Sequence, residues 1–114
     1  GLLTFWHTYQ LENRQDGAVL EISTDGGQSW SDLGSLITSG GYTNSITTRS
    51  GSPLAGRMAW TGGTIGVWSQ VTADLSSYAG QDVTLRFRLG SSRSKSSPGW
   101  YIDDVQVSGP VTVP

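Results

Sequence analysis

The chain has 114 residues, of which 35% are hydrophobic and 14% charged, so it suits one domain of a β-rich class with many tight turns. Seven basic residues against nine acidic ones give a net charge of -2, a poor match for nucleic acid or an anionic membrane, and no apolar run could span a bilayer. The lack of cysteine excludes disulfides and thiolate sites, and one histidine argues against His-based zinc or copper sites.

Short alternating segments, separated by clusters of Gly, Ser, Asn and Asp, predict strands along the chain. In chain order, we expect strands at residues 3–11, 18–23, 30–37, 54–61, 67–74, 83–89 and 100–107. We expect a loop or edge strand at 40–51, a short helical turn at 75–80 and a serine-rich loop at 91–99. About eight strands in one domain favour an all-β fold, an antiparallel β-sandwich of the jelly-roll kind.

The first and last predicted strands have faces that can be assigned. In residues 3–11 the odd positions are apolar or aromatic apart from His7, so we expect a core face with a hydrogen-bonded histidine. In residues 100–107 the alternation places Asp103 on the expected core side and Asp104 on the other. A buried carboxylate needs a partner, and Ca²⁺, an arginine or backbone amides would each serve. Two aspartates on opposite faces do not form the acid pair of a glycosidase.

Residues 23–30, Ser-Thr-Asp-Gly-Gly-Gln-Ser-Trp, fit the Asp-box pattern S-x-D-x-G-x-[ST]-W. In such a hairpin Asp25 accepts hydrogen bonds from its own turn, glycines permit positive φ, and Trp30 packs across the strands. We therefore interpret Asp25 as structural. The Asp box is found in many secreted proteins, so it favours an extracellular location.

Five tryptophans in this short chain indicate a second kind of site, because indole faces stack on sugar C–H groups while polar side chains bind hydroxyls. The candidate ligand-binding residues are Trp6, Trp60, Trp68, Gln70, Arg86 and Arg88. Trp68 and Gln70 share the polar face of one predicted strand, and Arg86 and Arg88 share that of another. If these faces adjoin, they form a groove for a polysaccharide. The alternative for each tryptophan is packing in the core or at its rim.

Two longer stretches, residues 3–30 and the closing Gly-Trp-Tyr-Ile-Asp-Asp-Val of 99–105, together resemble a bacterial extracellular jelly-roll module. Such modules occur as accessory domains of secreted metalloproteases of the immune-inhibitor-A kind and of other exported hydrolases. Their fold is similar to that of MAM domains. The closing segment also looks like the last strand of several carbohydrate-binding modules. The resemblance covers about residues 3–108 and is specific for the fold rather than for a ligand.

The resemblance implies a non-catalytic domain in which a structural Ca²⁺ ties the region of the first strand to the last. The positions that match are Glu12, Asp16, Asp103 and Asp104. The chain departs from the family at residues 91–97, where basic residues replace an acidic one. Members of the family also carry a strand before the first one here. The edge left open makes a strand-swapped oligomer an option.

Taken together, these features predict a secreted, non-catalytic module that binds polysaccharide and positions a neighbouring catalytic domain of the same polypeptide. The alternative is a structural or protein-interaction module of a secreted protease that binds no sugar. Because the chain starts at Gly1 and ends in a linker-like segment at 110–114, we expect one module at 1–109 with neighbours on both sides. An enzyme is disfavoured, since no serine has a nucleophile-elbow context and a second histidine is lacking.

Overall fold

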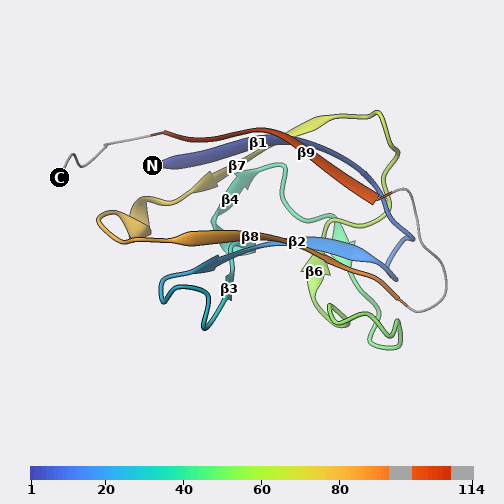
Figure 1. The fold of residues 1–114 in the computed structure, drawn as a ribbon. Helices are drawn as coiled ribbons and strands as arrows, with labels where there is room; N and C mark the ends of the chain where they lie inside the picture. Colours follow the sequence, from blue (N-terminus) through green and yellow to red (C-terminus); the bar gives the residue numbers. More distant parts are fainter. Residues whose placement is uncertain (93–98, 109–114) are drawn as a thin grey trace.

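Two antiparallel sheets face each other in the computed structural model, which describes residues 1–92 and 99–108 (Figure 1). In chain order the elements are β1 (Leu2–Gln10), β2 (Gly17–Ser23), β3 (Ser31–Asp32), the 3₁₀ turn η1 (Gly34–Leu36), β4 (Ile37–Ser39), β5 (Asn44–Ser45), β6 (Met58–Ala59), β7 (Ser69–Asp74), the 3₁₀ turn η2 (Ser76–Tyr78), β8 (Thr84–Gly90) and β9 (Gly99–Ser108). The larger sheet has the order β4-β7-β1-β9, the smaller β3-β2-β8, and β5 pairs with β6. The expected all-β antiparallel sandwich is confirmed.

The long strands β1, β2, β7, β8 and β9 lie within two residues of the segments that alternation predicted. The short helical turn expected at 75–80 is also present, as η2. No helix in the described ranges is long and apolar enough to cross a membrane. The linker-like tail expected at 110–114 and most of the loop expected at 91–99 lie outside the described residues.

The strand predicted at residues 30–37 is mostly a turn. Ser31–Asp32 pairs as β3 and Ile37 begins β4, but the Asp32 side chain accepts the N–H of Gly34 at 2.7 Å and bends the residues between them into η1. A side chain that bonds to nearby backbone in this way competes with strand pairing. The boundary therefore depends on a local hydrogen bond that the hydrophobic pattern does not report.

The strand predicted at residues 54–61 is likewise reduced to the two residues of β6. The hydroxyl of Ser50 accepts the N–H of Ser52, and the hydroxyl of Ser52 accepts the N–H of Leu54, both at 3.0 Å. These bonds fold the segment into turns, and Leu54 is buried from a turn rather than from a strand. The apolar character of this segment therefore indicates burial and not pairing as a β-strand.

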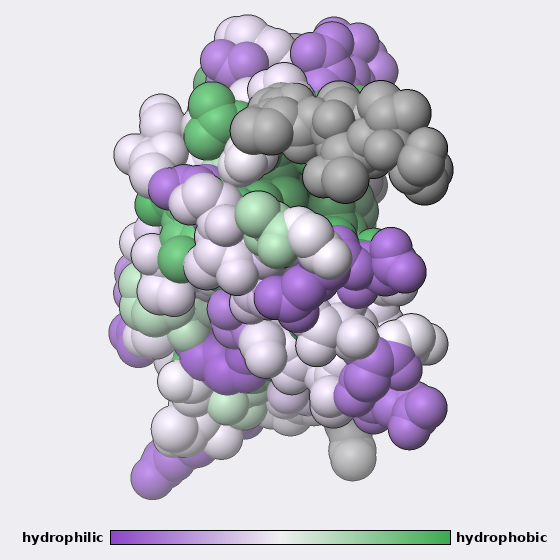
Figure 2. All heavy atoms as spheres, turned by 90° about the vertical axis from the view of Figure 1, so that its left-hand side faces the viewer, coloured by the Kyte–Doolittle hydropathy of each residue, from purple (hydrophilic) through white to green (hydrophobic). Residues whose placement is uncertain are grey.

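Among the described residues, one end of the sandwich, where β1 begins and β9 ends, carries exposed apolar side chains such as Val83 and Val107. A hollow of about 470 Å³ lies there, and Leu75, Tyr78, Val83 and Val107 contribute to its lining. Figure 2 views this end and shows hydrophobic side chains gathered in its upper half between more polar surroundings. Uncovered apolar surface of this kind is a feature of interaction sites.

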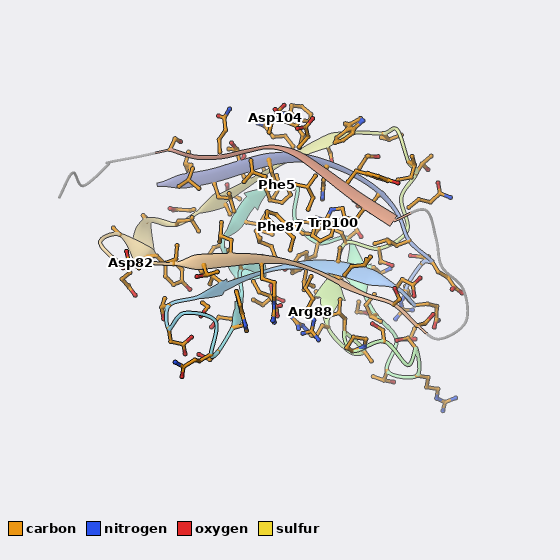
Figure 3. The ribbon with its side chains drawn as sticks, viewed as in Figure 1. Phe5, Asp82, Phe87, Arg88, Trp100 and Asp104 are labelled. Atoms are coloured by element: carbon orange, nitrogen blue, oxygen red, sulfur yellow. The ribbon has the colours of Figure 1, made fainter. Side chains whose placement is uncertain are left out.

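The core between the sheets is dominated by aromatic rings. Phe5 meets Phe87 and Trp60 edge-to-face, with ring centroids 5.2 Å and 6.1 Å apart. On the odd-numbered side of β1, Leu3, Phe5 and His7 are buried as predicted, and Tyr9 is partly buried. Burying each large apolar side chain contributes about 1.5–3 kcal/mol, so this cluster supplies much of the driving force for folding. Figure 3 shows Phe5, Phe87 and Trp100 between the two sheets.

A β-bulge in β9 changes the face that each of its residues presents. Thr4 pairs with Gln106 but Trp6 pairs with Asp103, so β9 holds one extra residue opposite Phe5. At the bulge Asp104 has a φ of 54°, a left-handed conformation that aspartate tolerates better than most residues.

The bulge corrects the predicted orientation of the last strand. Trp100 and Ile102 pack against the core, whereas the neighbouring Tyr101 is 56% exposed. Asp103 lies on the outer, exposed side with Tyr101 and not on the core side. Strict alternation fails here because the bulge changes the phase of the strand. Before the bulge the even-numbered residues face inward, whereas after it the odd-numbered Val107 is opposite the buried Leu3.

Candidate ligand-binding site

The outer face of the larger sheet carries a hollow of about 200 Å³ lined by Trp6, Trp68, Asp103 and Asp104. Trp6 projects from β1, Trp68 directly precedes β7, and both aspartates belong to β9. The indoles are 38% and 46% exposed, which leaves part of each ring open to solvent. The hollow therefore combines two aromatic surfaces with two carboxylates.

Strand pairing positions the polar side chains around Trp6. Because β1 lies between β7 and β9, Trp6 is directly opposite Gln70 on one side and Asp103 on the other. Residues directly opposite in an antiparallel pair point to the same face. An amide and a carboxylate thus flank the indole of Trp6. The structure brings together the predicted residues Trp6, Trp68 and Gln70.

The bulge places the second carboxylate in the hollow. In a regular strand Asp103 and Asp104 would point to opposite faces, but the left-handed conformation of Asp104 turns its side chain to the same side. The Oδ1 atom of Asp103 accepts the backbone N–H of Asp104 at 2.8 Å and holds this conformation. Figure 3 shows Asp104 on the side of the sheet away from the core. Within residues 1–92 and 99–108, the ion pairs involve Glu21 and Asp32, not these two aspartates.

Arg86 and Arg88 do not take part in this hollow. They belong to β8 in the smaller sheet, so the two polar faces expected to adjoin lie on opposite sides of the sandwich. Arg86 binds the buried carboxylate of Glu21 through Nη2 at 2.8 Å and Nε at 2.9 Å, and its guanidinium lies 4.2 Å from the ring centroid of Trp30. The predicted groove is corrected, because alternation says which face a residue shares within a strand but not which sheet the strand joins.

Trp60 is also removed from the ligand-binding set. It is 1% exposed, and its Nε1–H donates to the backbone oxygen of Gly40 at 2.9 Å. Its ring packs against Tyr42 and His7, with centroids 4.7 Å and 4.8 Å away. The core alternative applies to Trp60, since no face of the ring is available to a ligand.

Two other predicted carboxylates, Glu12 and Asp16, lie together in the turn after β1. The N–H groups of Gln15 and Asp16 both donate to the backbone oxygen of Glu12 at 3.0 Å. Asp16 is 1% exposed, and its Oδ1 accepts the N–H of Ser92 at 2.6 Å. The Oε2 atom of Glu12 is buried without a hydrogen-bond partner among the described residues. A buried carboxylate oxygen left unpaired is costly, and a cation would satisfy it.

The four carboxylates expected to share a calcium ion do not assemble. Asp103 and Asp104 lie on the outer face beside Trp6, whereas Asp16 is buried in the turn after β1. In the part of the chain that the structure describes, no three His, Cys, Asp or Glu side chains form a metal-binding group. The register also separates them, because Asp103 is opposite Trp6, four residues before β1 ends, whereas Glu12 and Asp16 follow that end. Of the four expected ligands, Glu12 and Asp16 share the turn after β1.

The Asp box has the predicted local structure. The Asp25 carboxylate accepts hydrogen bonds from the side chain and N–H of Ser29 and from the hydroxyl of Ser23. These bonds, with those from Ser29 first, hold the pKa of Asp25 well below its usual range. Gly26 and Gly27 have φ of 75° and 93°, as the turn requires. The carboxylate of Asp25 is therefore engaged by its own hairpin.

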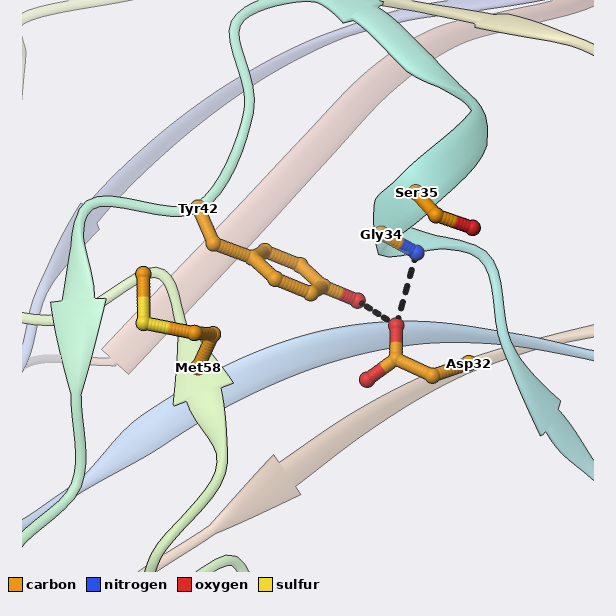
Figure 4. Close-up of a pocket in the computed structure, with 5 residues that line it drawn as sticks. All are labelled: Asp32, Gly34, Ser35, Tyr42 and Met58. Atoms are coloured by element: carbon orange, nitrogen blue, oxygen red, sulfur yellow. Dashed lines mark hydrogen bonds between the residues drawn. The ribbon is translucent and has the colours of Figure 1, made fainter.

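A further hollow, of about 430 Å³, was not indicated by the sequence (Figure 4). The Tyr42 hydroxyl donates to Asp32 at 2.6 Å, and the Asp32 carboxylate also binds Arg57 at 2.9 Å. Burial and the neighbouring Asp32 raise the pKa of Tyr42, so the phenol stays protonated. The polar groups are paired with each other, and exposed Met58 supplies apolar surface. This hollow is therefore suited to packing against an apolar group and not to acid–base chemistry.

Comparison with known proteins gives one short similarity. The chain is 46% identical over 41 residues to Bacillopeptidase F of Bacillus subtilis (strain 168), and the match covers 36% of this chain and 3% of that protein. No family profile and no solved structure matches the chain. The chain is thus similar to a small part of a peptidase, which is compatible with the resemblance to protease-associated accessory modules.

Proposed function

We propose that this chain is a non-catalytic accessory module of a secreted hydrolase that binds polysaccharide through the hollow at Trp6 and Trp68. The observation that carries the proposal is the pair of partly exposed indoles on one sheet face, with Gln70 and Asp103 on either side of Trp6. A flat indole face suits the apolar face of a sugar ring, and the neighbouring amide and carboxylate suit its hydroxyls. Stacking plus a few convergent polar groups is a sound basis for sugar binding.

The accessory role is supported by the short similarity to Bacillopeptidase F, because that protein is far longer than the matched segment. We propose a neighbouring catalytic domain in the same polypeptide and an extracellular location. Two groups suited to acid–base chemistry, His7 and Glu21, are engaged in the fold. His7 is buried with its Nδ1 bound by Trp100, and Glu21 is paired with two arginines. These hydrogen bonds and ion pairs favour a binding module over an enzyme.

A structural Ca²⁺ held by Glu12 and Asp16 is part of the proposal. The buried, unpaired Oε2 of Glu12 and the buried carboxylate of Asp16 fit a hard cation that takes oxygen ligands. When bound, the ion would neutralise two acids in the turn after β1. Asp103 and Asp104 are left out of this proposal because they face the hollow.

Affinity electrophoresis tests the binding function. Gels containing soluble glucans, xylans or other polysaccharides are run with Ca²⁺ and again with EDTA. We expect at least one polysaccharide to retard the protein, and Trp68→Ala to abolish the retardation. Val67→Ala is the matched control, because Val67 is the exposed neighbour of Trp68 and does not line the hollow. Retardation that survives both Trp6→Ala and Trp68→Ala would contradict the proposed site.

A structural or protein-interaction module of a protease is the second candidate. It is favoured by the apolar hollow at the end of the sandwich, lined in part by Leu75, Val83 and Val107 (Figure 2). β9 is also the last strand of its sheet among the described residues, so its outer edge could pair with a second copy in a strand-swapped oligomer. Lack of retardation by every polysaccharide, with a mass above the monomer in gel filtration, would favour this candidate.

A further inference from the structure

The Trp6–Trp68 hollow holds negative charge that the rest of the described fold does not neutralise. The Asp103 carboxylate accepts one hydrogen bond, from a backbone N–H. The Asp104 carboxylate accepts no hydrogen bond from residues 1–92 or 99–108. By contrast, Glu21 and Asp32 each pair with arginine. Both carboxylates line the same space as the two indoles. Among the residues that the structure describes, the lining of the hollow thus includes no cationic side chain.

From this we infer that the hollow selects polysaccharides with free amino groups, such as chains of glucosamine residues, over neutral and N-acetylated chains. The inference rests on the proposed function and names the substrate class of the same site. An ammonium group is attracted to the face of an indole and forms charge-assisted hydrogen bonds with carboxylates. A neutral sugar gains only stacking and ordinary hydrogen bonds. An acidic sugar would be repelled by Asp103 and Asp104.

The shape of the site favours a sugar ring over a lysine side chain. At about 200 Å³ the hollow is smaller than a pocket that encloses a drug-sized ligand, about 300 Å³ or more. It lies on the outer face of a sheet, with Trp6 and Trp68 each open to solvent. Such a surface can accept one flat ring of a chain that continues past it on either side. A basic peptide is therefore the competing ligand in the test.

The test measures affinity by isothermal titration calorimetry for hexamers of glucosamine, N-acetylglucosamine and glucose (cellohexaose), and for hexalysine. We expect the wild-type protein to bind the glucosamine hexamer about tenfold more tightly than the other sugars, as charge-assisted hydrogen bonds allow. Added salt should narrow this preference because it screens exposed charges. Equal affinity for all three sugars, or tighter binding of hexalysine, would overturn the inference.

Isosteric variants test whether the two carboxylates cause the preference for the glucosamine hexamer. In the double variant Asp103→Asn, Asp104→Asn, an amide oxygen can still accept the bulge N–H, and asparagine tolerates the positive φ. We expect this variant to lose the preference for the glucosamine hexamer. Asp82→Asn, which also converts an exposed aspartate to asparagine but far from the hollow and for one charge instead of two, should keep it (Figure 3). A preference that persists in the double variant would overturn the inference.

The outcomes also separate this inference from the proposed function. If sugars bind through Trp68 without a preference for amino groups, the inference fails and the proposed function stands. If Trp68→Ala leaves all sugar binding unchanged, both are overturned. If none of the three hexamers binds but another polysaccharide retards the protein, only the inference fails.

Discussion

The indole Nε1–H of Trp100 donates a hydrogen bond to Nδ1 of His7, with 3.0 Å between the two nitrogens. This bond joins β9 to β1 on the inner side of the larger sheet. Because an indole nitrogen only donates, Nδ1 must be unprotonated and the imidazole neutral. Burial lowers the pKa of His7 to about 4, which keeps it neutral at ordinary pH.

The first prediction concerns pH. The unfolded chain takes up a proton on His7 below pH 6.5, whereas the folded protein does so only near pH 4. The free energy of unfolding should therefore fall as the pH drops from 6.5 to 4, by roughly 3 kcal/mol. Urea unfolding at a series of pH values measures this. His7→Gln keeps an acceptor for Trp100 and should flatten the dependence, whereas an equally steep dependence in that variant would contradict the assignment.

The second prediction concerns Arg86, which pairs with the buried Glu21 and stacks on Trp30. Arg86→Ala leaves Glu21 with only Arg57, so the free energy of unfolding should decrease by about 2 kcal/mol, a value reduced for the partial exposure of Arg86. Arg88→Ala on the same strand should change it by less than about 0.5 kcal/mol. Denaturant titration of both variants provides the comparison, and equal effects would argue against a special role for the Glu21 pair.

The third prediction separates the two tryptophans first grouped as ligand-binding. Trp60→Ala should cost about 3–5 kcal/mol because it leaves a large cavity in the core. Trp68→Ala should change stability by less than about 1 kcal/mol, since much of the ring is exposed. Thermal unfolding measures both. If Trp60→Ala does not fold, Trp60→Phe gives a milder version of the same test. A small loss in Trp60→Phe equal to that of Trp68→Ala would contradict the core assignment.

The fourth prediction concerns calcium at Glu12 and Asp16. An ion that binds only the folded state raises the free energy of unfolding, so the melting temperature should be higher with Ca²⁺ than with EDTA. Glu12→Gln should reduce this difference, whereas Asp103→Asn should preserve it because Asp103 lies in the outer hollow. Loss of the calcium effect in Asp103→Asn would restore the four-carboxylate ligand set. An identical melting temperature in both buffers would remove the calcium proposal.

Part of the candidate site could be predicted from local pattern. Period-two alternation placed Trp6, Trp68 and Gln70 on polar strand faces, and the structure shows them on one sheet face. The bulge that adds Asp104 had a signal too: the apolar positions 100, 102, 105 and 107 advance by three residues in the middle, where the other steps are two. A change of phase within a strand requires an extra residue.

The sequence by itself determined the features that depend on neighbouring residues. These are the five long strands, the buried side of β1 and the Asp-box hairpin, because alternation and turn hydrogen bonds act over a few residues. Only the tertiary structure decided that Arg86 faces away from Trp68 and that Trp60 is enclosed by His7 and Tyr42. Strand order and burial arise from contacts between segments far apart in the chain. The same polar face or the same indole therefore becomes a binding surface or a core element according to what packs against it.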